Sequence, residues 1–256
     1  MTATRTHPKW TRPYVDGYAL KAYVMTLGPL NVNFDFDQQA AIGEEIKGGL
    51  CGHATVTPTA IGGIFDTTQT TGLHAVMSGA GARTLLITNG VNAAPVAGDE
   101  AFCGVFEQTG YEATPPVNGM VTVNIPFDKN SATATALYAN PWGVLLHAEG
   151  AETAVNTGTG VDDNGAATTA GGFMVYQLLS SNGTVTIKAQ HAAINSNGSF
   201  SDITGATSGA VDASSTPKYG LVEVATTLSI SRYLRWQIVL GTATTCTFVL
   251  AFVRGQ

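Results

Sequence analysis

Short runs of β-branched and aromatic residues, each bounded by glycine, asparagine, aspartate or proline, recur along most of this 256-residue chain. The residues inside the runs favour strands, whereas the bounding residues favour turns. In the clearest run, residues 184–190, Val185, Ile187 and Ala189 alternate with polar residues. This two-residue period is typical of a half-buried strand. Strands at such spacing, with almost no helical stretches between them, predict a sandwich or jelly roll.

Strands are expected near both ends of the chain. Residues 14–15 and 18–27 are joined by the pair Asp16-Gly17, which suits the type I′ turn of a hairpin. Residues 246–253 are apolar on both faces, which predicts a central position in a sheet. Further strands are expected at residues 74–77, 84–88, 101–110, 119–126, 142–148, 173–179, 221–230 and 233–240.

One segment has the pattern of a helix. Asp37 can cap its N-terminus by accepting amide hydrogen bonds. The good helix formers of residues 38–47 place Ile42 and Ile46 on one face, and Gly48 with Gly49 then ends the segment. The sequence therefore predicts an all-β fold with one short α-helix, at residues 37–47.

A shift in composition divides the chain. Residues 154–172 are rich in glycine, threonine and asparagine and contain almost no large apolar side chains. Such a segment buries too little apolar surface to offset the entropy of ordering it. We therefore expect a linker or loop at residues 151–171, between a β domain at 1–150 that contains the helix and a C-terminal β-sandwich at 172–256.

Charge and cysteine content exclude several classes of protein. Charged residues make up 12 % of the chain, about half the usual share, and the formal net charge is −6. The 12 cations are scattered, which argues against a basic nucleic-acid binder. Cys51, Cys103 and Cys246 lie too far apart to suggest a disulfide framework. No secretory signal or bilayer-length apolar run stands out, so we expect a soluble protein made in a cytoplasm, with no membrane partner.

Motifs that would support catalysis or metal binding are incomplete. The pair Cys51 and His53 offers two zinc ligands where three or four are needed, and the acidic residues 162–163 lack the last ligand of an EF-hand loop. His147 and Glu149 have deaminase spacing without the partner cysteines. We therefore expect no enzyme activity, no catalytic or cofactor-binding residue and no metal site.

The absence of a site favours a protein that assembles, because sheet edges and long loops can join copies by strand addition. Two segments are candidates for such contacts, one from Trp10 to Tyr14 and the other the glycine- and threonine-rich loop expected from Gly48 to Gly63.

Several segments resemble known virion proteins. The first half, through YVDGYAL (14–20), LGPL (27–30), KGG (47–49), APVAGD (94–99) and AFCGVF (101–106), resembles tail tube proteins of long-tailed bacteriophages. The second half, through VTIKAQ (185–190), GSFSDI (198–203) and SRYLRW (231–236), resembles small β domains appended to phage structural proteins.

This resemblance implies a tail-tube-like β-barrel or sandwich followed by an appended jelly-roll-like sandwich. It further implies usually hexameric rings that stack into a tube, with the partners being other copies, other tail proteins, and genomic DNA that passes through the lumen without specific binding. The protein would be assembled in the host cytoplasm and reside in the virion tail.

Three alternatives stay open at this point. One is a head decoration or capsid-surface protein. Another is a carbohydrate-binding adhesin in which Trp236, Tyr233 or Tyr219 stacks on sugars, although the alternation around Trp236 favours a buried strand. The last is a hydrolase whose site is assembled from distant residues.

Overall fold

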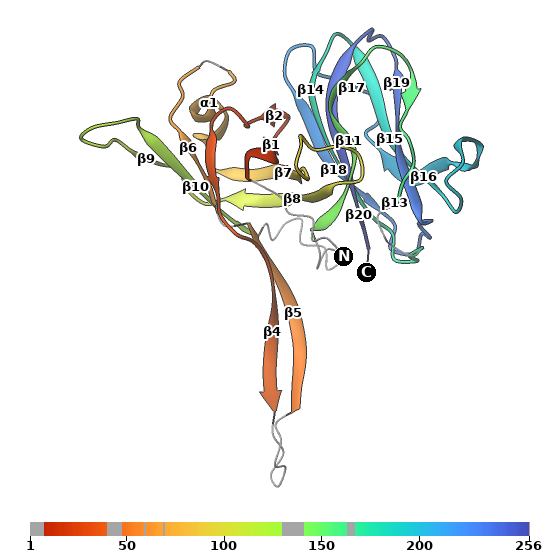
Figure 1. Cartoon of the computed structure of the whole chain (residues 1–256), viewed down its shortest axis with the longest axis horizontal. Coiled ribbons are helices and arrows are strands. Elements are labelled where there is room, and N and C mark those ends of the chain that lie inside the picture. The colour runs from red at the N-terminus through yellow and green to blue at the C-terminus, as the bar shows by residue number, and fades with distance from the viewer. Residues whose placement is uncertain are drawn as a thin grey trace.

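The computed structural model describes residues 8–39, 48–58, 60–68, 70–129, 141–162 and 167–255. The fold is all-β with one short α-helix, and its antiparallel sheets do not close into a barrel (Figure 1). The helix is α1 (Leu73–Met77), and two 3-10 turns lie at Pro8–Trp10 and Asn197–Ser199. The strands are β1 (Thr11–Val15), β2 (Tyr18–Ala19), β3 (Val24–Leu27), β4 (Leu30–Gln39), β5 (Gly48–Pro58), β6 (Ala60–Ile64), β7 (Gly81–Asn89), β8 (Glu100–Gln108), β9 (Glu112–Thr114), β10 (Thr122–Lys129), β11 (Trp142–Glu152), β12 (Asn156–Thr157), β13 (Val161–Asp162), β14 (Gly172–Ser181), β15 (Thr184–Ala192), β16 (Ser201–Thr207), β17 (Val211–Asp212), β18 (Lys218–Val224), β19 (Tyr233–Leu240) and β20 (Cys246–Arg254).

A 12-stranded sheet runs through both halves of the chain in the order β18-β14-β20-β11-β8-β10-β6-β3. Strand β7 pairs with β8, β1 pairs with β7, and β2 pairs with β1. The start of β11 pairs with β8 through Trp142, whereas most of its length pairs with β20 up to Glu152. Strand β11 thus joins the N-terminal and C-terminal parts by continuous hydrogen bonding.

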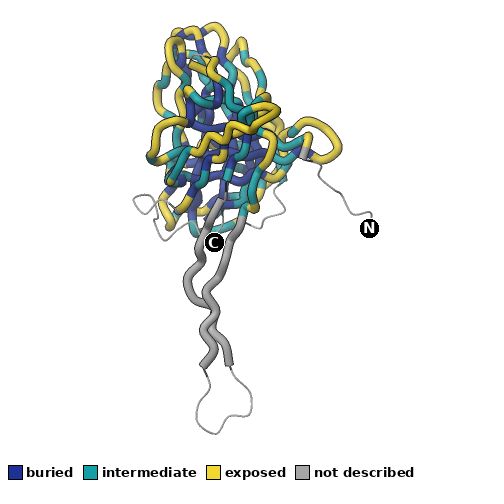
Figure 2. The backbone as a smooth tube through the Cα atoms, turned by 90° about the vertical axis from the view of Figure 1, so that its left-hand side faces the viewer, coloured by how far each residue is buried: buried dark blue, intermediate teal, exposed yellow. Residues whose placement is uncertain are grey.

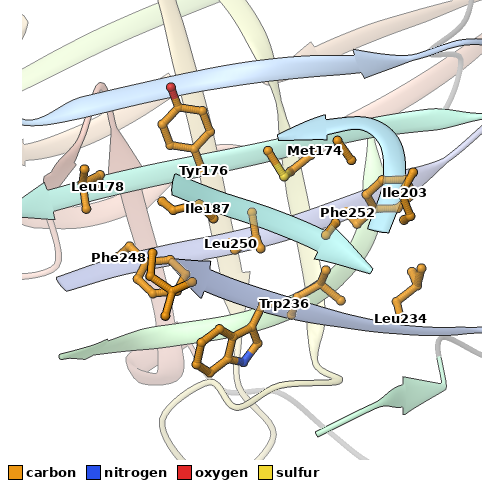
Figure 3. Close-up of a cluster of buried hydrophobic side chains, with 14 of the residues drawn as sticks. Met174, Tyr176, Leu178, Ile187, Ile203, Leu234, Trp236, Phe248, Leu250 and Phe252 are labelled. Atoms are coloured by element: carbon orange, nitrogen blue, oxygen red, sulfur yellow. The ribbon is translucent and has the colours of Figure 1, made fainter. Parts of the chain in front are cut away.

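The C-terminal part is a sandwich. A six-stranded sheet, built on β12-β19-β15-β16, packs against β18, β14, β20 and β11. The side chains between the two sheets form a buried core (Figure 3), and Figure 2 shows buried residues inside the body of the protein. Val185, Ile187 and Ala189 of β15 are fully buried, and both faces of β20 are covered. The strand predictions for these two segments are confirmed.

The N-terminal part has its own apolar core. Strands β1, β6, β7, β8 and β10 and helix α1 supply its side chains. In α1, Leu73, Val76 and Met77 are buried, which is the spacing of one helical face. The other large members of this core are Val15, Leu20, Ile61, Leu85, Ile87, Phe102, Phe106, Val123, Ile125 and Phe127.

A third buried cluster joins the two parts, because the outer face of β14 and β20 packs against β7 and β8. A polar contact reinforces this junction: the fully buried Gln177 amide accepts a hydrogen bond from the Gly17 N–H and donates one to the Thr84 carbonyl at 3.0 Å. The Asp16 carboxylate accepts hydrogen bonds from the Thr84 N–H and the Arg83 guanidinium, both at 2.9 Å. The junction is therefore both apolar and specifically hydrogen-bonded.

The turn of the first hairpin agrees with the sequence, but the strand expected at residues 18–27 is divided into β2, which pairs with β1, and β3, which pairs with β6. The expected helix is not confirmed either. Asp16 and Gly17 have φ angles of 50° and 84°, as the expected type I′ turn requires. The helix prediction at residues 37–47 is wrong where it can be compared, since residues 37–39 belong to β4, and residues 40–47 lie outside the described chain. Cross-strand pairing with β5 overrides the local helix propensity there.

The one described α-helix lies instead at Leu73–Met77, where a strand was expected at residues 74–77. The expected linker, residues 151–171, contributes the end of β11 and the short strands β12 and β13, which pair with β19. The division into units at 1–150 and 172–256 stays a prediction.

Candidate assembly surface

The hairpin formed by β4 and β5 projects from the body of the protein (Figure 1). Its ladder runs from the pair Leu30–Pro58 to the pair Gln39–Gly48. Ten residues of strand correspond to about 33 Å of extended chain. Within the described residues, these two strands form a sheet of their own and pair with no other strand.

Residue types alternate between apolar and polar along the first part of β4, and the register with β5 matches this alternation. Val32 pairs with Val56 and Phe34 with Ala54, whereas Asn33 pairs with Thr55. From Leu30 to Phe34 the register thus places apolar residue types opposite apolar ones and polar types opposite polar ones, whereas beyond the register shift Asp37 pairs with Leu50. An isolated two-stranded hairpin is marginally stable in water. This hairpin is thus suited to pack against a further surface.

Two open sheet edges provide a second kind of contact. Strands β3, β6, β10 and β9 are neighbours in that order, and β3 and β9 each have one partner strand in the described part of the chain. Met25 of β3 is 60 % exposed, and Met120, between β9 and β10, is 61 % exposed. Unpaired edges beside exposed apolar side chains are templates for strand addition.

The segment from Trp10 to Tyr14 lies within the sheet rather than apart from it. Trp10 is half-buried, and its carbonyl accepts a hydrogen bond from Gly90. Tyr14 in β1 is buried and donates a hydrogen bond to Glu149 at 3.0 Å, and burial together with this carboxylate raises the pKa of the Tyr14 hydroxyl. The segment holds the two parts of the molecule together, and its role in assembly stays a prediction.

The segment from Gly48 to Gly63 is not the expected loop. It forms β5 and β6, so the loop prediction is wrong. Gly48 opens β5 opposite Gln39 and therefore belongs to the projecting hairpin. Gly63 lies inside the N-terminal part, where an added Cβ would come within 2.6 Å of the Tyr23 carbonyl oxygen. The sequence does carry a signal for the first strand of this hairpin, because residues 30–36 alternate between apolar and polar types.

Cys103, Cys246 and Trp236, whose side chains could take part in chemistry or in binding, are buried in the structure. Cys103 and Cys246 are buried free thiols, and burial raises the pKa of Cys246 to about 11; the side chain of Cys51 lies outside the described residues. Trp236 is 7 % exposed and packs edge-on against His147 and Phe248, which confirms the buried-strand interpretation. Figure 3 shows Trp236 and Phe248 among the side chains of this core. The side chains described contain no group of three or more potential metal ligands. No helix in the described ranges is long and apolar enough to cross a membrane.

Acidification is expected to destabilise the sandwich through His147. This ring stacks on Phe248 at 3.9 Å between centroids, and burial lowers its pKa below 6.5 although Glu152 opposes the shift. The unfolded chain then binds the proton more readily, so the free energy of unfolding falls as pH drops below about 6.5.

Thermal unfolding at pH 7.5 and 5.5 measures this effect. His147→Phe keeps an aromatic ring but removes the titration, so its melting temperature should fall less between the two pH values than that of the natural chain. His191 also has a lowered pKa, so some dependence on pH should remain in the variant. An equal fall in both proteins would contradict this role of His147.

Comparisons with known proteins give little direct guidance. No family model and no curated protein matches the chain. Among solved structures, the chain is similar to the Dit protein of bacteriophage SPP1, described as a paradigm of the hub of the adsorption apparatus in phages that infect Gram-positive hosts. The likeness covers 94 % of this chain and 98 % of that one, with 12 % sequence identity and a TM-score of 0.32. A TM-score at this level carries no functional argument.

Proposed function

We propose that this chain is a non-enzymatic structural subunit of a bacteriophage tail, which assembles with copies of itself into rings that stack as a tail tube. The observation that carries the proposal is the projecting β4–β5 hairpin, whose strands pair with no other strand of the described chain. The resemblance of the sequence motifs to tail tube proteins points in the same direction. Other tail proteins would be its neighbours in the virion.

Ring formation would use the open edges β3 and β9. They lie at opposite ends of the β3-β6-β10-β9 sheet, so joining β3 of one copy to β9 of the next extends the sheet from head to tail. A head-to-tail contact of this kind produces a closed ring when the rotation between copies closes. The hairpin would then reach across to the adjacent ring.

The charge of the chain is compatible with a conduit for DNA. The net charge is −6 and the 12 cations are scattered along the sequence. DNA is held mainly by arrays of lysine and arginine that neutralise phosphates. A tube without such an array would let DNA pass during ejection without retaining it.

Ring formation is tested by changing one exposed residue beside each edge. Met25→Lys and Met120→Lys are expected to convert rings into monomers, because lysine at an edge discourages strand addition. Ile194→Lys is the matched control, since Ile194 is 68 % exposed but lies on a loop of the C-terminal sandwich. All three variants should retain the melting temperature of the natural chain.

Negative-stain microscopy and sedimentation velocity distinguish the outcomes. The natural chain and Ile194→Lys should form rings or tubes, whereas the two methionine variants should sediment as single chains. Isolated trimers would favour the head decoration alternative. A natural chain that stays monomeric at millimolar concentration would overturn the proposed function.

A further inference from the structure

A cavity of about 380 Å³ lies at the junction of the two parts of the molecule. It is lined by the turn before β2, by β2 and the segment that follows it, by the loop before α1, by β14 and by the loop between β17 and β18. None of its lining residues carries a charge. They are Gly17, Tyr18, Ala19, Tyr23, Thr70, Thr71, Leu179, Ala213, Ser214, Ser215, Thr216 and Pro217.

Hydroxyl groups dominate the polar lining, and most of them are free. Among the described contacts, the side chains of Tyr18, Tyr23, Thr71, Ser215 and Thr216 form no hydrogen bond within the protein. Hydroxyls elsewhere on the sandwich are used internally, as shown by Ser181, Ser208 and Thr242. Each free hydroxyl offers one donor and two acceptor positions to a ligand.

Apolar surface accompanies these hydroxyls. Leu179 and Pro217 contribute to the wall, as do the half-buried Tyr18 and Tyr23, which also pack against the N-terminal core. Tyr219 is 43 % exposed and pairs with Gln177, which places it on the sheet face that meets the Asp16-Gly17 turn. Amphipathic tyrosine rings next to hydroxyls can contact both the C–H and the O–H groups of a ligand.

Two walls of the cavity, the Asp16-Gly17 turn and the β17–β18 loop, are in contact with each other. Gln177 binds Gly17, and an added Cβ at Gly17 would lie 2.5 Å from Cβ of Pro217, so the turn and the β17–β18 loop are in close contact. Thr70 has a φ of 68°, a strained conformation for a β-branched residue. The contacts of Gly17 hold the turn and the β17–β18 loop together, and preformed walls lose little entropy on binding.

We propose that this cavity is a binding site for a small neutral saccharide. Ligand pockets typically have volumes of about 300 to 1,000 Å³, and this one, at about 380 Å³, suits one or two sugar rings. The uncharged lining disfavours phosphate or carboxylate ligands, which need cationic partners. Free hydroxyls beside tyrosine rings match a ligand that is itself covered with hydroxyl groups on an apolar ring.

Saturation-transfer NMR with the full chain tests the site, using N-acetylglucosamine, methyl α-glucoside and maltose as probes. At least one probe should receive saturation from the protein. Thr71→Trp, which fills the cavity, should abolish the transfer, whereas Thr226→Trp, an exposed threonine on another loop, should leave it unchanged. Ser215→Ala combined with Thr216→Val should weaken binding about tenfold, because hydroxyl partners are lost.

The proposal does not depend on assembly, so its result is separate from the test of ring formation. No transfer to any of the three probes would overturn it, as would transfer that persists in Thr71→Trp. Broadening of cavity resonances with protein concentration, in the absence of transfer, would show that another copy occupies the cavity instead. Both tryptophan variants should keep the natural melting temperature, which excludes unfolding as the cause of a lost signal.

Discussion

Val32→Lys is expected to prevent rings from stacking into tubes, while Asn33→Lys leaves tubes intact. Both positions lie in β4, one residue apart, but Val32 pairs with Val56 in the apolar set and Asn33 pairs with Thr55 in the polar set. Burying a valine contributes about 1.5–3 kcal/mol, and burying an unpaired lysine charge costs more. Every copy in a ring loses this burial energy, so the total loss is large enough to prevent the rings from stacking.

Negative-stain microscopy of the two variants provides the measurement. Val32→Lys should leave single rings, because the edges β3 and β9 are unchanged. Replacing residues 31–57 by a short glycine-serine turn provides a second test and should give the same single rings. Normal tubes from this shortened chain would remove the hairpin from the stacking contact, and the same defect in Asn33→Lys would show that the alternating pattern has no role.

Arg83→Met is expected to cause a large loss of stability in the folded chain. Arg83 contacts the Asp16 carboxylate at 2.9 Å, and the two side chains are 17 % and 6 % exposed. Removing one partner of a buried ion pair leaves an uncompensated charge and costs about 3–5 kcal/mol. We expect the lower end of that range here, because Asp16 keeps its hydrogen bond from the Thr84 N–H.

The loss should also depend on pH. Burial already raises the pKa of Asp16, and Arg83 opposes that shift. Without Arg83 the pKa rises further, so the carboxyl group can protonate in the folded state and the penalty shrinks as pH falls towards 4. Urea unfolding at pH 7 and pH 4 measures this difference.

Two controls accompany the measurement. Asp16→Asn combined with Arg83→Met removes both charges and should recover most of the lost stability. Arg232→Met breaks the Asp162 pair, in which Arg232 is 53 % exposed, and should cost less than about 1 kcal/mol. Equal losses in Arg83→Met and Arg232→Met would show that burial of the Asp16 pair has no energetic consequence.

Features that depend on neighbouring residues could be predicted from the sequence. The Asp16-Gly17 turn requires two positive φ angles, and aspartate and glycine both adopt such angles readily. The alternation of residue types in β15 likewise predicts that one face is buried, and the apolar run of β20 predicts that both faces are buried. The all-β class follows from many such segments.

Features that depend on distant partners could not be predicted in the same way. Residues 37–39 have helix-compatible types, but pairing with residues 48–50 draws them into a strand. The contact between Gly17 and Gln177 joins positions 160 residues apart, and nothing local to either position indicates it. The first strand of the hairpin does have a local signal, the alternation of residues 30–36, whereas its continuation into residues 37–39 depends on the partner strand.

The shared strand β11 has a mechanical consequence. It pairs with β8 at Trp142 and with β20 as far as Glu152, so the N-terminal and C-terminal parts are joined by a hydrogen-bonded strand and not by a linker alone. A pull along β11 loads its ladder bonds in shear, where many must rupture together rather than one after another. Tension between the N-terminal and C-terminal parts would therefore be borne by both ladders of β11.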